Sequence, residues 1–198
     1  MPEAAPSAPL PAFFEFNAPG AWRAVDFISD LHLCEAMPAT FRAWEQHLRH
    51  STADAIFILG DLFEVWVGDD ARSQPFARRC VDVLAEAACC RQLAFMVGNR
   101  DFLVGRSLLR EAGLMALPDP TVLSAWGHNV LLSHGDALCL SDTPYQAFRR
   151  EVRSAAWQDA FLARPLAERV ALAAEMRKAS AERWKMDSDA DADVDTAC

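Results

Sequence analysis

The sequence has no run of apolar residues as long as a membrane-spanning helix needs, which is roughly 18 or more in succession. Its N-terminal segment, MPEAAPSAPLPAFFEFNAPG, lacks the basic start and the continuous apolar stretch of a secretory signal. None of the six cysteines forms a C-x-x-C pair. Together these absences predict a cytoplasmic protein whose thiols stay free in a reducing compartment.

Positive charge is also scarce. The formal net charge is -9 at pH 7, and no long basic stripe runs along the chain. Proteins that bind nucleic acids hold the phosphate backbone with clustered lysine and arginine side chains. The sequence therefore disfavours a nucleic-acid partner.

The chain has 198 residues, 52% of them hydrophobic, which is enough to bury one sizeable core. Helical spacing of apolar residues over 145–185 predicts two or three helices interrupted by Pro165, and the simplest interpretation is a helical cap on the core. We expect the following parts along the chain: a flexible Pro/Ala-rich leader (1–21), a core (22–142), a helical lid (143–186) and an acidic disordered tail (187–198).

Four apolar segments that contain β-branched or aromatic residues each end in polar side chains. AVDFIS leads to Asp30 and His32, AIFILG to Asp61, LAFMVG to Asn99, and NVLLS to His134. Such segments predict strands that are buried on both faces. Because the helical patterns FRAWEQHLRHS and FARRCVDVLAEAACC separate the first three, we predict an α/β fold with a parallel sheet and helices on its faces.

Ligands of open parallel sheets bind beyond the carboxyl ends of the strands, so we expect the four polar endings to face one cleft. Aspartate, histidine and asparagine are hard or borderline donors that suit Mn, Fe, Zn or Mg. Two ions about 3.5 to 4 Å apart need a bridging carboxylate, and Asp61 is the natural bridge. Each ending alone is explained equally well as a turn or a cap. The recurrence of all four favours a metal site.

The motifs D-x-H, G-D, G-N-R-D and H-G-D follow one another in the order typical of the calcineurin-like metallophosphoesterase superfamily, which this chain resembles. The longer strings SDLHLCE, FILGDLFEVWVGDD, GNRDFLVG and HGDALCLSDTPYQAFRR are similar to its branch of pyrophosphate hydrolases in lipid A biosynthesis. The resemblance implies a layered α/β sandwich with a helical lid insertion. It also implies a dinuclear metal centre that hydrolyses phosphate esters and anhydrides.

The resemblance implies roles for individual residues as well. One manganese ion would be held by Asp30, His32 and Asp61, and a second by Asp61, Asn99 and His134. Two Mn²⁺ ions are therefore the expected cofactors. Asp61, Asn99 and His134 would be catalytic. The residues expected to contact substrate are Asn99, Arg100, Asp142 and Ser180.

The implied reaction hydrolyses the pyrophosphate bond of UDP-2,3-diacylglucosamine to 2,3-diacylglucosamine 1-phosphate (lipid X) and UMP. The lid would hold the acyl chains, and its basic rim suits a peripheral position on the cytoplasmic face of the inner membrane. Two alternatives stay open. The chain could be another metallophosphoesterase of nucleotide diphosphates or phosphodiesters, or a catalytically inactive binding protein.

The chain departs from the family pattern in two places. Beyond Ser180 the pattern has an amide and, three residues on, a lysine, where this chain has Trp184 and Asp187, with Lys185 nearby. The superfamily also ends its metal site with G-H-x-H, yet no histidine follows His134. From the sequence we therefore expect a truncated chain without half of the second sheet, and impaired hydrolysis.

Overall fold

A four-stranded parallel sheet forms the centre of the core. The computed structural model describes residues 13–178. Three of the strands coincide with the apolar segments AVDFIS, AIFILG and LAFMVG, which confirms that part of the prediction. All neighbouring pairs are parallel. In spatial order the strands are β2 (Val25–Ile28), β3 (Ala55–Leu59), β4 (Gln92–Met96) and β5 (Leu114–Ala116).

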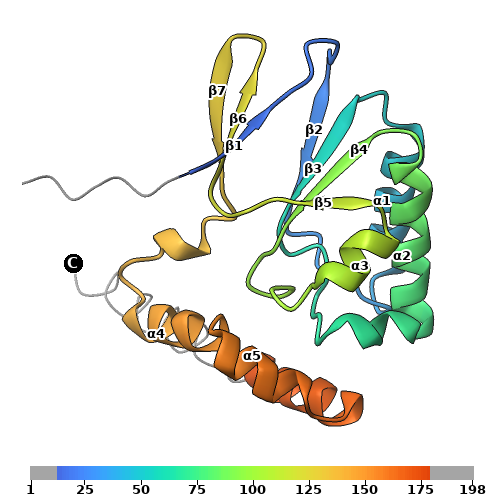
Figure 1. Cartoon of the computed structure of the whole chain (residues 1–198). Coiled ribbons are helices and arrows are strands. Elements are labelled where there is room, and N and C mark those ends of the chain that lie inside the picture. The colour runs from blue at the N-terminus through green and yellow to red at the C-terminus, as the bar shows by residue number, and fades with distance from the viewer. Residues whose placement is uncertain (1–12, 179–198) are drawn as a thin grey trace, which may run out of the picture.

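Helices cover one face of this sheet (Figure 1). Ile56 and Ile58 of β3 point to that side and share a buried core with Trp44 and Leu84 of the helices. Two of the helices begin with a proline, whose fixed φ and missing N–H suit the first turn. The helical elements of the core are α1 (Pro38–His50), the 3-10 helix η1 (Asp69–Ser73), α2 (Pro75–Ala88) and α3 (Arg106–Glu111).

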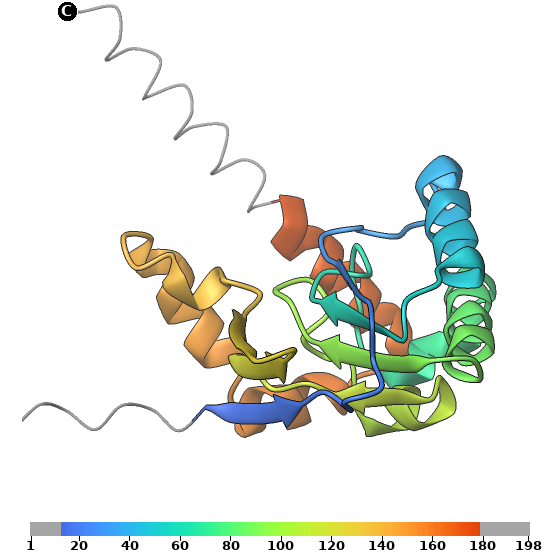
Figure 2. The ribbon, with the colours of Figure 1, turned by 90° about the horizontal axis from the view of Figure 1, so that it is seen from above.

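A second sheet packs on the opposite face. Phe57 and Met96, the sequence neighbours of helix-facing residues, are buried there against Leu123 and Leu132. Seen from above, the helices and the second sheet lie on opposite sides of the parallel strands (Figure 2). The predicted layered α/β sandwich is therefore confirmed. The strands of the second sheet, in spatial order, are β1 (Phe14–Asn17), β6 (Thr121–Ala125) and β7 (His128–Leu132).

The prediction of a flexible leader over 1–21 is wrong for residues 14–17, which form β1 and pair in parallel with β6. The reason is aromatic packing. The ring of Phe16 lies 5.6 Å from that of Phe57 and 5.8 Å from that of Trp22, and burial of aromatic area offsets the entropy lost when the segment is ordered.

The prediction that all four polar endings follow strands buried on both faces is wrong for the first and the last of them. β2 lies at the edge of the parallel sheet and is only partly buried, and β7 is mostly exposed. β7 belongs to the second sheet and is antiparallel to β6. It is an edge strand, so its Val130 and Leu131 side chains are exposed. Apolar composition predicted a strand here, but it does not determine which strand is the partner.

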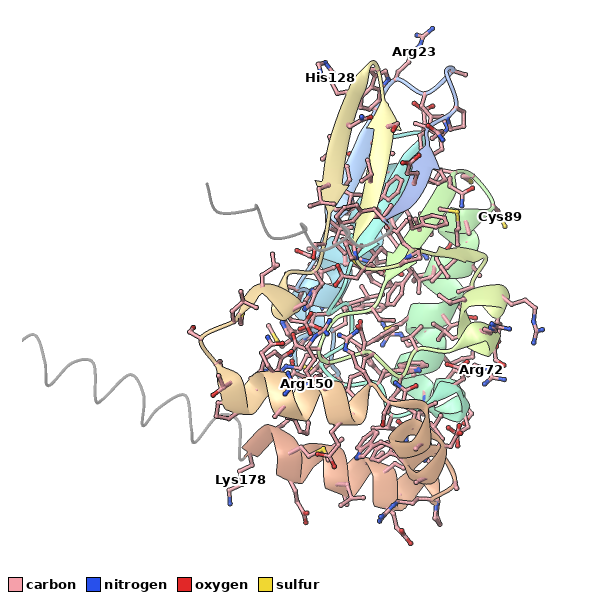
Figure 3. The ribbon with its side chains drawn as sticks, turned by 60° about the vertical axis from the view of Figure 1, so that its left-hand side comes forward. Arg23, Arg72, Cys89, His128, Arg150 and Lys178 are labelled. Atoms are coloured by element: carbon pink, nitrogen blue, oxygen red, sulfur yellow. The ribbon has the colours of Figure 1, made fainter. Side chains whose placement is uncertain are left out.

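A lid of three helical segments follows the second sheet and lies along one end of the core (Figure 3). Pro165 stands between the second and third segments, as the sequence predicted. Arg150 is on the first segment, and Lys178 is the last described residue of the third (Figure 3). In chain order, after the 3-10 helix η2 (Asp136–Leu138), the lid segments are α4 (Thr143–Val152), α5 (Ala155–Leu162) and residues 166–178.

Between residues 13 and 178 no helix has the length and apolar character needed to cross a membrane. The cysteines of this part of the chain form no disulfides, which agrees with the expectation of free thiols.

Arginines of the lid pair with carboxylates of the core. Arg149 Nε donates to Asp136 Oδ2 at 2.8 Å, and Arg153 Nη2 donates to the same oxygen at 3.1 Å. Arg169, which is only 3% exposed, pairs with Asp70 on η1. These ion pairs hold the lid at two separated points of the core.

We expect the lid to detach before the core unfolds in acid. Hydrogen bonds from Arg169 lower the pKa of Asp70. Burial raises the pKa of Asp136, but the bond from Arg149 and further partners outweigh it, so the pKa of Asp136 is below its ordinary value. A lowered native pKa gives stabilisation that is present above the unfolded value of about 3.9 and is lost as the pH falls further.

Amide hydrogen exchange at pH 6, 4 and 3 measures this release. The amides of the lid should lose protection at pH 3 while those of β3 and β4 keep it. Simultaneous loss of protection in both regions would show that the acid-sensitive carboxylates do not hold the lid separately.

Candidate metal centre

Three of the predicted ligands converge at one point. Asp30 follows β2, Asp61 follows β3, and His134 follows β7. One ligand atom of each lies within 4.8 Å of the others. The expectation that polar side chains at separate strand ends share a common site is confirmed for these residues, although the third comes from the second sheet.

Asp61 lies between two histidines. Its Oδ2 is 3.8 Å from His32 Nε2, and its Oδ1 is 3.8 Å from His134 Nε2. The side chain is 2% exposed, and burial raises the pKa of Asp61, although the Arg100 N–H and the two histidines favour the charged form. Its two carboxylate oxygens therefore face two separate histidine nitrogens, as a bridging position requires.

Hydrogen bonds to the protein determine which nitrogen of each histidine faces the site. His134 Nδ1 is 3.0 Å from the carbonyl oxygen of Leu59, which can only accept, so Nδ1 carries the proton. His32 Nδ1 is likewise 3.1 Å from Glu64 Oε2. In their neutral forms both rings therefore turn the Nε2 lone pair toward Asp61, the orientation of metal-binding histidines.

Asn99 completes this arrangement. Its Oδ1 lies 3.0 Å from His134 Nε2, while its backbone N–H points to the same nitrogen at 3.4 Å. In the neutral ring with its proton on Nδ1, the amide oxygen and Nε2 face each other as two acceptors. Acceptor atoms that face one another beside a buried carboxylate fit a divalent cation, and their nitrogen and oxygen chemistry suits such an ion.

The backbone at the site is held in uncommon conformations. Asp30, His32 and Asp61 have φ values of 54°, 49° and 53°, in the left-handed region that residues other than glycine rarely adopt. Backbone hydrogen bonds join the loops, among them those from the Asp30 N–H to the Gly60 carbonyl at 3.1 Å and from the His32 N–H to the Asp61 carbonyl at 3.0 Å. Strained residues of this kind concentrate at functional sites.

Asp101 supports the site from beneath and has no exposed surface. Its oxygens accept four backbone N–H groups, at distances between 2.8 and 3.4 Å. Burial raises the pKa of Asp101 to about 6, with the Gly98 N–H acting in the opposite direction. The four N–H donors belong to Asp61, Leu62, Phe63 and Gly98. Asp101 thus ties together the loops that follow β3 and β4.

A cavity of about 290 Å³ lies beside these residues, between the core and the lid. Asn99 and Arg100 line it on the side of the metal centre. Three more arginines line it from the lid. Most of the remaining wall is apolar and includes Trp66, Phe102, Leu103, Phe148, Val152, Trp157, Phe161 and Met176. The cavity thus joins a basic region to an apolar one.

Comparison with known proteins identifies the family. The model of the calcineurin-like phosphoesterases matches residues 24–190. The chain belongs to this family. A protein of Xanthomonas axonopodis pv. citri named UDP-2,3-diacylglucosamine hydrolase is 50% identical over 159 residues, or 79% of this chain and 64% of the relative. One of the same name from Aromatoleum aromaticum is 53% identical over 146 residues, or 72% and 59% of the two chains.

This chain thus spans less than two thirds of the length of these relatives. Among solved structures, a protein of unknown function from Aquifex aeolicus aligns with a TM-score of 0.41 and 17% identity, over 65% of this chain and 70% of its own.

Gly60 and Gly98 allow the loops of the site to approach each other. Gly60 has a φ of +93°, and a Cβ there would lie 2.5 Å from His134 Nδ1. A Cβ on Gly98 would lie 2.1 Å from Asp61 Oδ1 and 2.5 Å from the Asp61 nitrogen. These distances leave no space for a side chain at either position.

Gly98→Ala is therefore expected to displace Asp61, destabilising the chain by about 2 kcal/mol and weakening metal binding. Thermal unfolding and a Mn²⁺ titration measure the two effects. Gly20→Ala is the matched control, because no atom lies within 4 Å of a Cβ at Gly20. Equal behaviour of the two variants would mean that the loops can separate freely.

The remaining predicted site residues are placed as follows. Arg100 lines the cavity, and its Nη1 is 3.7 Å from Glu64 Oε1. Asp142 is the N-cap of α4, where its Oδ1 accepts from the Tyr145 N–H at 2.9 Å, and it is absent from the cavity wall. The other predicted or discussed positions, Ser180, Trp184, Lys185 and Asp187, lie outside the described residues.

Sequence reasoning missed three acidic residues that organise the site: Glu64, Asp101 and Asp136. Asp101 and Asp136 belong to the quoted motifs GNRD and HGD, so their positions were marked but their roles were not. The only signal for Glu64 was its place in the string FILGDLFEVWVGDD. None of them faces the point where Asp30, Asp61 and His134 meet.

Proposed function

We propose that this site binds UDP-2,3-diacylglucosamine and serves hydrolysis of its pyrophosphate bond, to lipid X and UMP, in lipid A biosynthesis. The observation that carries the proposal is that the candidate metal centre adjoins an apolar cavity. Asn99, which contacts His134, also lines the apolar cavity beneath the lid. A substrate with a diphosphate at one end and acyl chains at the other fits such a cavity. Relatives about half identical to this chain bear the corresponding name.

We assign two Mn²⁺ ions to the donor cluster. Asp30, His32 and Asp61 would hold one, and Asp61, Asn99 and His134 the other. Divalent cations supply positive charge that stabilises phosphate oxygens and lowers the pKa of water. The unprotonated Nε2 atoms of the histidines support this assignment, since metal binding requires neutral imidazole.

The residues of the chain itself would bind and orient the substrate. The planar guanidinium of Arg100 can hold two phosphate oxygens at once. The arginines of the cavity offset the overall charge of -9 where the anionic substrate enters. The apolar lid residues would hold the acyl chains away from water. Asp142, which is not part of the cavity wall, and Ser180 would also contact the substrate.

A peripheral position on the cytoplasmic face of the inner membrane is part of the proposal, because the substrate is a lipid. Leu138 and Leu140, just before α4, are 72% and 74% exposed. Arg150 is exposed on α4 nearby. Exposed leucines next to a basic side chain suit the boundary between acyl chains and anionic headgroups.

Acyl dependence tests the substrate. In the presence of Mn²⁺ the chain should bind the diacylated sugar nucleotide at least about 100-fold more tightly than unacylated UDP-glucosamine, since each buried CH₂ contributes about 0.8 kcal/mol. Formation of UMP, followed by chromatography, reports the reaction. Equal affinity for the two ligands would contradict the lipid substrate and favour a general nucleotide-diphosphate or phosphodiester hydrolase. Tight binding without UMP would indicate a binding protein.

A further inference from the structure

Glu64 connects the metal centre to the lid. It lies beyond the end of β3, where its N–H donates to the Leu33 carbonyl at 3.1 Å. One carboxylate oxygen, Oε2, is 3.1 Å from His32 Nδ1. The other, Oε1, pairs with Arg177 of the third lid segment and lies 3.7 Å from Arg100 Nη1. A single side chain thus contacts a candidate metal ligand, a candidate phosphate ligand and the lid.

The contact with His32 determines the orientation and the tautomer of that ring. A carboxylate accepts and does not donate, so His32 Nδ1 must carry a proton, and in the neutral ring Nε2 is then the free nitrogen. Among residues 13–178, Glu64 is the carboxylate that contacts Nδ1, since the other two carboxylates near the ring, Asp30 and Asp61, face Nε2. Without Glu64 the ring could turn or take the other tautomer.

The ion pair with Arg177 is a third contact between the core and the lid, after those of Asp136 and Asp70. The lid pairs of Asp136 and Asp70 involve α4 and the beginning of the third segment. Arg177 is near the end of that segment, and its partner is the only one of these carboxylates that also contacts a predicted metal ligand. Within residues 13–178, Glu64 therefore links two contacts: the ion pair with Arg177 that holds the lid, and the contact that orients His32.

We propose that Glu64 is a positioning residue: it holds His32 in the orientation needed for a cation and, through Arg177, fixes the third lid segment over the same site. This inference rests on the proposed function only in taking His32 as a metal ligand. The two contacts, with His32 and with Arg177, depend on different properties of the Glu64 carboxylate. An uncharged acceptor suffices for His32, whereas Arg177 requires the negative charge.

Three substitutions separate the two contacts. Glu64→Gln keeps an acceptor for His32 but loses the charge. Arg177→Leu removes only the lid contact. Glu64→Leu removes both. Glu86→Leu is the matched control, because Glu86 pairs with Arg49 far from the site.

Histidine ¹⁵N spectra of the metal-free chain above pH 8 give the first readout, with the His32 signals assigned from a His32→Ala variant. The unmodified chain, Glu64→Gln and Arg177→Leu should show His32 protonated at Nδ1, and Glu64→Leu should not. Affinity for Mn²⁺ should fall about 10- to 100-fold in Glu64→Leu, as is typical when an outer hydrogen-bond partner is lost, and should be close to normal in Glu64→Gln.

Amide exchange over residues 170–178 gives the second readout. It should be about fivefold faster in Glu64→Gln, Arg177→Leu and Glu64→Leu, the effect of losing one partly exposed ion pair, and unchanged in Glu86→Leu. Circular dichroism confirms that each variant is folded.

The proposal is overturned if His32 keeps its Nδ1 proton in Glu64→Leu, or if the three variants exchange no faster than the control. Both readouts are independent of hydrolysis. If UDP-2,3-diacylglucosamine is not a substrate, the proposed function fails while the tautomer and the lid exchange still decide the role of Glu64.

Discussion

Asp61→Asn is expected to abolish cation binding while the metal-free chain stays folded. Asp61 supplies one oxygen to the side of His32 and the other to the side of His134. An amide has a single acceptor oxygen and no charge, so it cannot serve both sides. Affinity for Mn²⁺ should fall more than about 100-fold, beyond the roughly 10–100-fold typical of outer partners. Isothermal titration measures this loss.

The same substitution should leave the free energy of unfolding of the metal-free chain equal or higher at pH 7. Burial raises the pKa of Asp61, which means that its charge is unfavourable in the folded state at neutral pH. The asparagine oxygen can still accept from the Arg100 N–H, which now lies 2.8 Å from Asp61 Oδ1. Neutralising the side chain therefore removes a penalty and retains a hydrogen bond.

Thermal unfolding with and without Mn²⁺ compares the two effects. The ion should raise the Tm of the unmodified chain and not that of Asp61→Asn, because only a ligand that binds the native state stabilises it. Asp82→Asn, on the exposed side of α2, is the control. An Asp61→Asn variant that binds Mn²⁺ normally would remove Asp61 from the metal centre.

Much of the central sheet could be predicted from local sequence because its inner strands, β3 and β4, are largely buried on both faces. Ile56 and Ile58 face the helices, and Ala55 and Phe57 face the second sheet, so β3 has no polar position until Gly60 and Asp61. An uninterrupted apolar run that stops at a polar residue is the pattern such a strand must have. The polar endings of β2, β3 and β4 could be placed at one edge because parallel strands share their direction.

The origin of His134 could not be predicted in the same way. NVLLS resembles the other strands in composition, yet β7 is an exposed edge strand of a different sheet. Its position depends on pairing with β6, whose sequence TVLSA carries no polar ending of this kind, and on β1. Pairing between distant segments is a tertiary property that period and composition do not contain.

The roles of Glu64 and Asp101 also depend on tertiary structure. Both are acids close to predicted ligands, so sequence alone does not distinguish them from ligands. The fold turns Glu64 toward Nδ1 of His32, the side away from Asp61, and buries Asp101 beneath the backbone of two loops. Asp101 shows how large the effect of such a supporting residue can be.

Asp101→Ala is expected to be the most destabilising single substitution considered for this chain. It would leave four backbone N–H groups without their acceptor in a place that has no solvent exposure. Each unsatisfied buried donor costs about 1–3 kcal/mol, and because local rearrangement relieves part of this, we expect a total of about 4 kcal/mol. For a chain of this length that corresponds to a Tm lower by about 8–16 °C.

An Asp101→Asn variant should lose only part of these hydrogen bonds. One oxygen of the amide can still accept from the N–H groups of Asp61 and Gly98, whereas its NH₂ group would meet those of Leu62 and Phe63, donor against donor. In urea unfolding, the stability of Asp101→Asn should therefore lie between that of the unmodified chain and that of Asp101→Ala. Asp82→Ala controls for the loss of an exposed carboxylate. If Asp101→Ala unfolds at the same urea concentration as this control, the four hydrogen bonds do not hold the loops of the metal centre together, and the strained φ values of Asp30, His32 and Asp61 must be maintained by other contacts.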